Sequence, residues 1–256
     1  MANTTLMQGD CLELMNNVKD QSIDMILCDL PYGTTRCKWD TVIPFEPLWN
    51  QYKRIIKPNG AIVLFGSEPF SSHLRLSNLK WYKYDWVWDK KSTTGFLNAK
   101  IRPLRRHEYV HIFSNGKPVY YPIMETRGRP RKKGSYNKKV GNGDMVYGAF
   151  NNLNSYNNIY YPTDILEFSN ASQKGKIHPT QKPVALLEYL IRTYTNEGDV
   201  VLDNCMGSGS TGIACVSTNR NFIGMELDQK YFEIAEKRIY ERVSSIEQSK
   251  VPEMPV

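Results

Sequence analysis

The sequence predicts an α/β fold built on a mostly parallel sheet, and three observations support this expectation. Short apolar runs suited to buried strands alternate with segments whose apolar residues recur at helical spacing. An acid and a proline turn follow one such strand directly, at residues 29–32. A glycine turn leads from another strand into a helix, at residues 203–212. Open α/β sheets collect ligands at the carboxyl ends of their strands, so we expect both turns at one edge of one sheet.

The first part of the chain alternates predicted strands with predicted helices. Apolar residues recur at helical spacing from Phe45 to Ile56, and Pro58-Asn59-Gly60 is expected to end that helix. Two later apolar runs look like neighbouring strands joined by a long loop. The predicted strands cover residues 5–8, 23–28, 61–65, 84–88 and 109–113. A short helix is predicted to begin after the turn at residue 9, and longer helices are predicted at 45–57 and 69–78.

The composition changes at about residue 115, where Asn, Gly, Tyr and Lys/Arg become frequent. A stretch this long is not an ordinary connection, so we expect an inserted basic region at 115–175, with the core formed by 1–114 and 176–256. Its tyrosines favour some packing over a disordered tail. The core then resumes with predicted helices at 184–195, 211–218 and 229–241 and predicted strands at 200–203 and 221–225.

The composition bounds the class of protein. The 256 residues, 41% of them hydrophobic, suffice for one full core. No apolar run approaches the roughly 18 residues that span a membrane. The five cysteines form no C-x-x-C pair and their count is odd, which argues against a disulfide framework or a structural zinc site and favours a reducing cytoplasm.

The net charge of +7 is concentrated in one segment. Residues 127–139 contain seven cations and no anion, which equals the whole net excess. This distribution predicts a local positive field that attracts a polyanion. The alternative is a solvated basic loop.

Residues 29–32 supply three groups within one turn. Asp29 offers a carboxylate, Leu30 a backbone carbonyl that Pro31 restrains, and Tyr32 a flat stacking surface. This set suits an amino group on a planar ring, such as the exocyclic amine of a nucleic-acid base. The alternative is a strand-ending turn with an incidental acid.

The glycine turn predicts a nucleoside site. Gly207 and Gly209 allow unusual backbone angles and close approach of a ligand, and Glu226 ends the next predicted strand, where an acid can accept both ribose hydroxyls. The spacing to Gly212 also fits a dinucleotide fingerprint. Only 30 residues follow Glu226, so the remaining strands must come from earlier in the chain, which is a permuted order.

Together these residues resemble the DNA amino-methyltransferases of the permuted, beta type, which use S-adenosylmethionine (AdoMet) to methylate the exocyclic amine of adenine or cytosine. The family's catalytic motif is Asp/Ser/Asn-Pro-Pro-Tyr/Phe, from which Leu30 departs. Its cofactor motif is Phe-x-Gly-x-Gly, in which Cys205 replaces the aromatic residue. Residues 9–13 and 178–183 resemble the segments near the cofactor's adenine and methionine.

The resemblance covers about 1–113 and 176–241 and leaves the middle region unmatched. It implies a Rossmann-like AdoMet-dependent methyltransferase sheet with permuted motif order and an inserted target-recognition lobe. The implied catalytic residues are Asp29, Leu30, Pro31 and Tyr32. The implied cofactor-binding residues are Asp10, Cys11, Thr180, Lys182, Asp203, Met206, Gly207, Ser208, Gly209, Thr211 and Glu226.

A target base inside a duplex must be flipped out before it can react. The implied partner is double-stranded DNA, and a homodimer is possible. The expected DNA-binding residues are Arg127, Arg129, Arg131, Lys132 and Lys133, of which residues 127–130 look like a minor-groove hook. His107 and His111 alternate on a predicted strand and are read as strand residues rather than metal ligands, so no metal is expected.

The leading hypothesis is a DNA adenine N6-methyltransferase, because Asp at the first motif position is commoner in the adenine enzymes of the family. Cytosine N4 methylation is the alternative within the same chemistry. A DNA-binding module with a vestigial cofactor site and an NAD oxidoreductase are the alternatives from other classes.

Overall fold

The computed structural model describes residues 2–34, 40–133, 155–170 and 181–250. The chain divides into a larger unit, Met1–Tyr121 with Asp164–Val256, and a smaller unit, Pro122–Thr163. In the described ranges, no helix combines the length and apolar character needed to cross a lipid bilayer.

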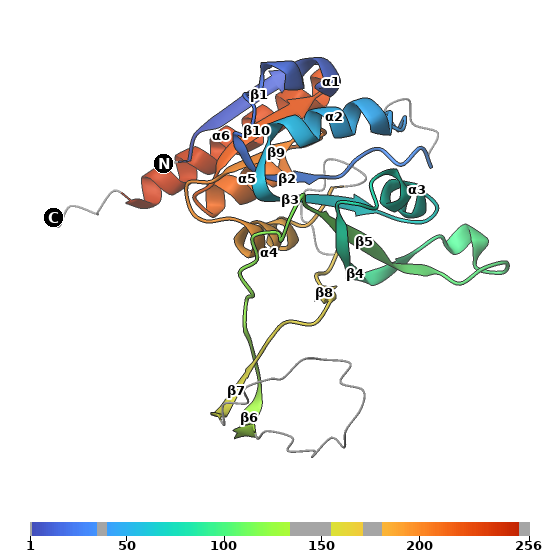
Figure 1. Ribbon diagram of the computed structural model, residues 1–256, viewed down its shortest axis with the longest axis vertical. Helices are drawn as coiled ribbons and strands as arrows, with labels where there is room; N and C mark the ends of the chain where they lie inside the picture. The colour runs from blue at the N-terminus through green and yellow to red at the C-terminus, as the bar shows by residue number, and fades with distance from the viewer. Residues whose placement is uncertain (1, 35–39, 134–154, 171–180, 251–256) are drawn as a thin grey trace. The chain divides into compact units, whose positions relative to one another are not determined.

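The larger unit is built on an eight-stranded sheet in the order β1-β10-β9-β2-β3-β5-β4-β8 (Figure 1). Neighbouring strands are parallel except at the β3–β5 and β5–β4 pairs, so β5 runs against the other seven. The expected α/β sheet with permuted strand order is therefore confirmed. The strands are β1 (Thr4–Gln8), β2 (Ile23–Cys28), β3 (Ile56–Gly66), β4 (Tyr82–Thr94), β5 (Arg105–Phe113), β8 (Ile165–Glu167), β9 (Val200–Asp203) and β10 (Asn221–Glu226).

Helices cover both faces of this sheet, and buried side chains between the sheet and the helices form a separate hydrophobic core layer on each face. Alternation along β2 shows why: Met25 and Leu27 join one layer, and Ile26 and Cys28 join the other. The first layer packs under α4 (Val184–Tyr194), α5 (Ser210–Ser217) and α6 (Gln229–Lys250), and the second under α1 (Cys11–Leu14), α2 (Phe45–Ile55) and α3 (Phe70–Ser77).

The pairing of β2 with β9 joins the two halves of the chain. Met25 pairs with Val201 and Ile26 with Leu202, in parallel register. The Asp24 carboxylate accepts a hydrogen bond from the Val200 backbone N–H (2.9 Å). The carboxyl ends of these two strands therefore lie side by side, and so do the turns that follow them.

Two predicted boundaries were wrong for identifiable reasons. Helix α2 ends at Ile55, and β3 begins at the next residue. The expected turn at 58–60 is part of β3, because the register between β2 and β3 shifts between Ile23 and Met25 and accommodates residues 57–60 as an irregular stretch of the strand. The β4 and β5 strands extend well beyond the apolar runs 84–88 and 109–113, because the added residues pair across a hairpin whose side chains are mostly polar or charged and so show no apolar alternation.

The smaller unit, Pro122–Thr163, is shorter than the inserted region 115–175 that the composition predicted. The Tyr121 N–H donates to the Thr193 carbonyl (2.8 Å), and β8 pairs with β4 in the main sheet. The described residues on both sides of Pro122–Thr163 thus belong to the larger unit, because backbone hydrogen bonds tie them there.

Candidate functional site

The glycine turn after β9 presents one open backbone position. Gly207 has φ 51°, and a Cβ added there would meet no atom within 4 Å. Its α-carbon therefore faces free space, and the positive φ explains why a residue without a side chain stands there. This is the place at which a ligand can approach the backbone closely.

Gly209 does something different from what its motif predicts. It has φ 78° and caps the N-terminus of α5. A Cβ there would lie 2.9 Å from the Ala235 Cβ and 3.0 Å from the Ala235 Cα on α6. The missing side chain thus allows two segments of the protein to pack together, whereas its contact with a ligand stays a prediction.

Asp203 and Thr211 shape the same turn by bonding to each other. The Thr211 hydroxyl donates to Asp203 Oδ2 (2.6 Å), and the Cys205 N–H donates to Asp203 Oδ1 (3.1 Å). Burial raises the pKa of Asp203 to about 6, although these hydrogen bonds oppose the shift. Both residues were predicted to bind cofactor; here they brace the turn that would do so.

Glu226 closes the opposite side of this turn from the end of β10. Its carboxylate accepts the N–H groups of Gly207 (2.8 Å) and Asp228 (2.9 Å). Each carboxylate oxygen has a second lone pair, so the group can still accept hydroxyls from a ligand. Its neighbour across the sheet is Gln8, and Asp10 just beyond it caps α1 by accepting the Leu12 N–H (2.7 Å).

Two buried residues that were not predicted as site residues, Tyr52 and Asn204, stabilise the glycine turn from its core side. The buried Tyr52 hydroxyl donates to Asn204 Oδ1 (2.6 Å), and the Asn204 amide contacts the sulfurs of Cys11 and Cys205 (3.5 Å each). Cys205 therefore occupies the family's aromatic position within a small polar cluster. The helical spacing of Tyr52 marked it as core, and only its hydroxyl distinguishes it.

The remaining predicted cofactor residues are partly accounted for. Met206 is buried, and its N–H donates to the Met225 carbonyl (2.9 Å). Ser208 is buried, and its carbonyl accepts a hydrogen bond from Arg238. Thr180 lies outside the described residues.

The tetrapeptide after β2 forms a compact cluster beside this turn. Leu30 is buried in the core, and Pro31 is half-buried. The Tyr32 hydroxyl donates to Asp29 Oδ1 (2.7 Å). Asp29 Oδ2 accepts from the Lys182 ammonium at 2.6 Å, although the two residues lie 153 positions apart in the sequence.

Lys182 and Asp29 belong to a charge quartet that also contains Glu108 and Lys90. Glu108 lies 3.4 Å from the Lys182 Nζ and 3.1 Å from the Lys90 Nζ. Both ammonium groups are buried, with 9% and 4% of Lys182 and Lys90 exposed. Two carboxylates and two ammonium groups sum to zero charge, so the attraction within the set offsets part of the cost of burying four charged groups.

The electrostatics of the charge quartet follow from burial and pairing together. Burial raises the pKa of Asp29, and the attraction of Lys182 only partly opposes that shift. For Lys182, burial would lower the pKa, but Asp29 and Glu108 together hold it above its ordinary value. Burial and the Asp29 charge raise the pKa of Tyr32, so its hydroxyl stays a donor.

Lys182 was predicted to bind cofactor, which stays a prediction, and its ammonium lies 2.6 Å from Asp29 Oδ2. It lies 5.0 Å from the Phe65 ring centroid and 5.9 Å from those of Tyr32 and Trp88. Glu108 and Lys90 were not predicted to take part, and their one detectable signal is that each is a charged residue close to an apolar strand run.

Tyr32 is held flat by an aromatic neighbour that the sequence analysis missed. The rings of Tyr32 and Phe70 stack with centroids 4.9 Å apart and planes 25° from parallel. Phe70 opens helix α3. Whatever fixes α3 therefore fixes the ring of Tyr32.

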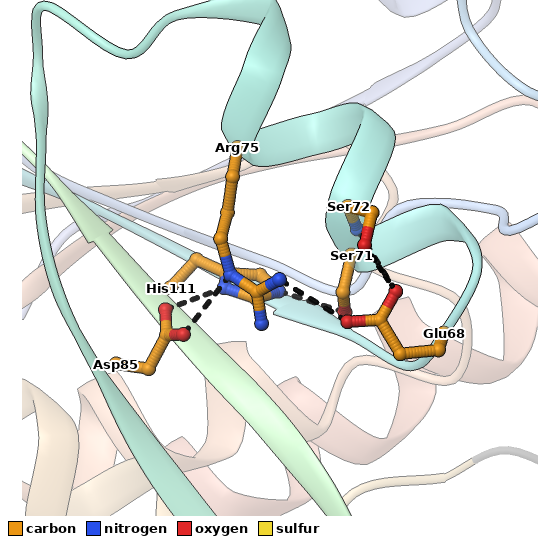
Figure 2. Close-up of polar contacts among 6 residues, drawn as sticks. All are labelled: Glu68, Ser71, Ser72, Arg75, Asp85 and His111. Atoms are coloured by element: carbon orange, nitrogen blue, oxygen red, sulfur yellow. Dashed lines mark hydrogen bonds and ion pairs between the residues drawn. The ribbon is translucent and has the colours of Figure 1, made fainter.

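Figure 2 shows the polar chain that fixes α3 against β4 and β5. His111 Nδ1 lies 2.6 Å from Asp85 Oδ1, and His111 Nε2 lies 2.9 Å from the Ser71 hydroxyl. Arg75 donates to Asp85 and Glu68 (3.1 Å each). His111 was expected to be a strand residue rather than a metal ligand, and its ring is committed to these two partners.

The order Ser71–His111–Asp85 has the connectivity of a hydrolase triad, but its burial gives it another role. Ser71 and His111 are fully buried, so no substrate can reach the hydroxyl. Ser71 follows Phe70 directly in the sequence. The chain of hydrogen bonds therefore positions the helix turn that stacks on Tyr32.

The basic residues of the smaller unit lie on β6 (Glu125–Lys133), which pairs with β7 (Ser155–Tyr160). The register shifts between Thr126 and Arg131, so residues 127–130 bulge out of the ladder. The guanidinium groups of Arg127 and Arg131 each lie 5.7 Å from the centroid of the Tyr160 ring. Arg129, Lys132 and Lys133 lie on the same strand, while residues 134–139 lie outside the described part of the chain.

No cluster of His, Cys, Asp and Glu suited to a metal ion occurs among the residues that the structure describes. The donors gathered at the carboxyl edge of the sheet are instead engaged with cations, hydroxyls and backbone N–H groups.

The family model for DNA methylases of the N6/N4 type matches residues 23–237. The chain is 28% identical to the Type II methyltransferase M.HpaI of Haemophilus parainfluenzae, over 91% of this chain and 73% of that protein. It is 29% identical to the orphan methyltransferase M.BamHII of Bacillus amyloliquefaciens, over 88% of this chain and 92% of that protein.

Solved structures agree with these sequence matches. The M1.HpyAVI–SAM complex superposes with a TM-score of 0.62 and 26% identity, covering 92% of this chain and 98% of that one. The cytosine-N4-specific PvuII DNA methyltransferase superposes with a TM-score of 0.65 and 17% identity, covering 98% and 94%. At that identity the second match shows the fold alone.

The raised pKa of Asp203 predicts a pH-dependent stability difference for Asp203→Asn. The folded state holds this proton more tightly than the unfolded chain, so the wild type loses stability as pH rises from about 4 through the folded pKa of about 6. Because asparagine does not titrate, its stability relative to the wild type should increase by about 2–3 kcal/mol between pH 4 and pH 8. Urea unfolding across this range measures it, and a pH-independent difference would contradict the assignment.

Proposed function

The chain belongs to the DNA methylase family of N6-adenine and N4-cytosine amino-methyltransferases, and from this premise we propose that it transfers the methyl group of AdoMet to the N6 amine of adenine in double-stranded DNA. The observation that carries the proposal is the position of Asp29 to Tyr32 at the carboxyl end of β2, beside the glycine turn that follows β9. A reactive turn and a cofactor turn at neighbouring strand ends are what methyl transfer between two bound molecules requires.

The catalytic turn prepares a poor nucleophile. The lone pair of an aromatic amine is delocalised into its ring, and two hydrogen bonds from its N–H groups favour a tetrahedral nitrogen with the lone pair exposed. We assign these acceptors to the Asp29 carboxylate and the Leu30 backbone carbonyl. Tyr32, held by Phe70 on one side, presents its ring to the base.

Lys182 serves this turn as a positioning residue. Its ammonium holds one Asp29 oxygen and the Tyr32 hydroxyl holds the other. Since each carboxylate oxygen can accept a second hydrogen bond, the amine can bind without expelling either partner. The positive charge also favours the ionised carboxylate that the amine needs.

The residues around the glycine turn fit AdoMet, which supplies a methyl group on an electrophilic sulfonium. Gly207 leaves open space at the backbone, which a Cβ would fill. Glu226 retains lone pairs for the ribose hydroxyls, and Asp10 and Cys11 lie past the end of the adjacent strand β1, where the family binds the adenine. We propose these four residues as the cofactor contacts.

The choice of adenine over cytosine rests on Asp29 at the first position of the motif, where the family's adenine enzymes commonly carry Asp. The catalytic turn itself serves either base, since both amines present two N–H donors. The basic strand β6 supports DNA as the substrate, because its cations suit phosphate contacts and its bulge at 127–130 suits a narrow minor groove.

Nucleoside analysis tests the proposed function directly. DNA from cells that express the chain should contain N6-methyladenine, detected by mass spectrometry after digestion to nucleosides. Asp29→Asn should reduce methyl transfer at least about 100-fold while AdoMet binding persists. Methylcytosine without methyladenine would overturn the base assignment, and full activity in Asp29→Asn would remove Asp29 from the mechanism.

The role of Lys182 predicts a change in pH dependence. Burial already raises the pKa of Asp29, and Lys182→Met removes the charge that opposes this shift. The acid limb of the kcat/KM profile, which reports the free enzyme, should therefore move to higher pH. Lys182→Arg keeps the charge and should keep the limb closer to its wild-type position. An unmoved limb in Lys182→Met would mean that Lys182 does not control the ionisation of Asp29.

Gly207 and Gly209 should separate binding from folding. Gly207→Ala meets open space, so the protein should fold with a strain of about 1 kcal/mol, but calorimetry should show AdoMet affinity reduced at least tenfold. Gly209→Ala drives a Cβ against Ala235 and should lower Tm more than Gly207→Ala does. Normal AdoMet affinity in Gly207→Ala would place the cofactor elsewhere.

A further inference from the structure

The tip of the hairpin between β4 and β5 exposes apolar side chains. Leu97, Ile101 and Phe96 are 85%, 81% and 77% exposed, the highest values among the large hydrophobic residues that the structure describes. Exposed apolar groups gathered in this way mark an interaction surface. We call residues 95–104 the hairpin tip.

The hairpin tip is an ordered turn with its own backbone hydrogen bonds. Gly95 has φ 87° and precedes a short 3-10 turn, Phe96–Asn98. The Asn98 N–H donates to the Gly95 carbonyl (2.9 Å), and the Ile101 N–H donates to the Asn98 carbonyl (3.0 Å). The apolar side chains are thus presented on a defined backbone.

The charge around the hairpin tip identifies the partner. Residues 91–107 contain five Lys/Arg and no Asp/Glu. Lys91 and Arg106 pair with carboxylates, but no ion pair within the described residues engages Lys100, Arg102 or Arg105. An apolar tip flanked by free cations is complementary to nucleic acid, whereas a second copy of this tip would oppose like charges.

The hairpin formed by β4 and β5 starts beside the charge quartet. Trp88 pairs with Glu108 across β4 and β5, and Thr94 pairs with Arg105 farther out. Glu108 contacts Lys182, which holds Asp29. The three residue steps from Glu108 to Arg105 span roughly 10 Å of extended strand, so the same strand connects the charge quartet to the exposed tip.

We propose that the hairpin tip is a wedge that enters duplex DNA beside the target nucleotide and fills the space left by the flipped base. Phe96, Leu97 and Ile101 are of the residue types that unstack base steps. Lys100, Arg102 and Arg105 hold the adjacent phosphates. The inference rests on the proposed function, because a wedge is needed only where a base must leave the stack.

The test compares two DNA duplexes that carry the recognition site found by methylation mapping. In one the target base is paired, and in the other it faces an abasic site and is already unpaired. Phe96→Ala combined with Leu97→Ala should lower kcat/KM at least tenfold on the paired duplex and less than threefold on the abasic duplex. Tyr240→Ala, which removes an exposed ring from α6, is the control and should preserve both rates.

Other results would overturn the wedge. Equal losses on both duplexes, or no loss, would mean that the tip does not act on base opening. Conversion of a wild-type dimer into a monomer by the double substitution would make the tip a self-association surface. Failure of the wild type to methylate even the abasic duplex would overturn the proposed function and the wedge together.

The cations have a separate readout. Replacing Lys100, Arg102 and Arg105 by Gln should reduce the log–log salt slope of DNA binding by about 2.7, at about 0.9 per lost phosphate contact. Replacing Lys230 and Lys237 on α6 by Gln is the matched control and should leave the slope unchanged. An unchanged slope in the hairpin variant would overturn the phosphate contacts.

Discussion

The parallel pairing of β2 with β9 is the constraint on which the rest of the structure depends. It places Cys28 and Asp203, the last residues of two strands far apart in the sequence, at neighbouring positions in one sheet. The turn at residues 29–32 and the glycine turn are brought together by this pairing alone among the strand pairs, since no other pair joins β2 to β9. Asp24 strengthens the junction by bonding the Val200 N–H and the Lys57 ammonium from within β2. Helices on both faces then keep these strand ends fixed relative to each other.

The charge quartet extends this arrangement to electrostatics. Asp29 alone, at a buried strand end, would tend to hold a proton, which would hinder its proposed role as the acceptor of one amine N–H. Lys182 counters that tendency, and Glu108 and Lys90 complete a neutral set. The hydrogen bonds among Asp85, His111 and Ser71 complement this by fixing the ring that stacks on Tyr32. Charge and ring orientation are thus controlled by separate sets of residues.

The sequence predicted those features whose cause is local. Strand alternation, the proline turn at Asp29 and the glycines near Gly207 act over a few residues and could be located before the fold was known. Contacts made by tertiary packing could not: Lys182 reaches Asp29 from 153 positions away, and Phe70 reaches Tyr32 from a different helix. The net charge of the whole chain was also a poor guide. The seven cations of segment 127–139 equal the net charge of +7, so a second basic segment, 91–107, went unnoticed because acids elsewhere in the chain cancel its charge in the sum.

The permuted order has a consequence for synthesis on the ribosome. The N–H of Val200 bonds to Asp24 across 176 positions, so the edge of β2 that pairs with β9 has no partner strand until those intervening residues have been made. At 5–20 residues per second that interval is roughly 9–35 s. During this time an apolar strand exposes unpaired backbone groups, the feature that promotes edge-to-edge association. A strand that lies inside the finished sheet is therefore an edge strand for that part of synthesis.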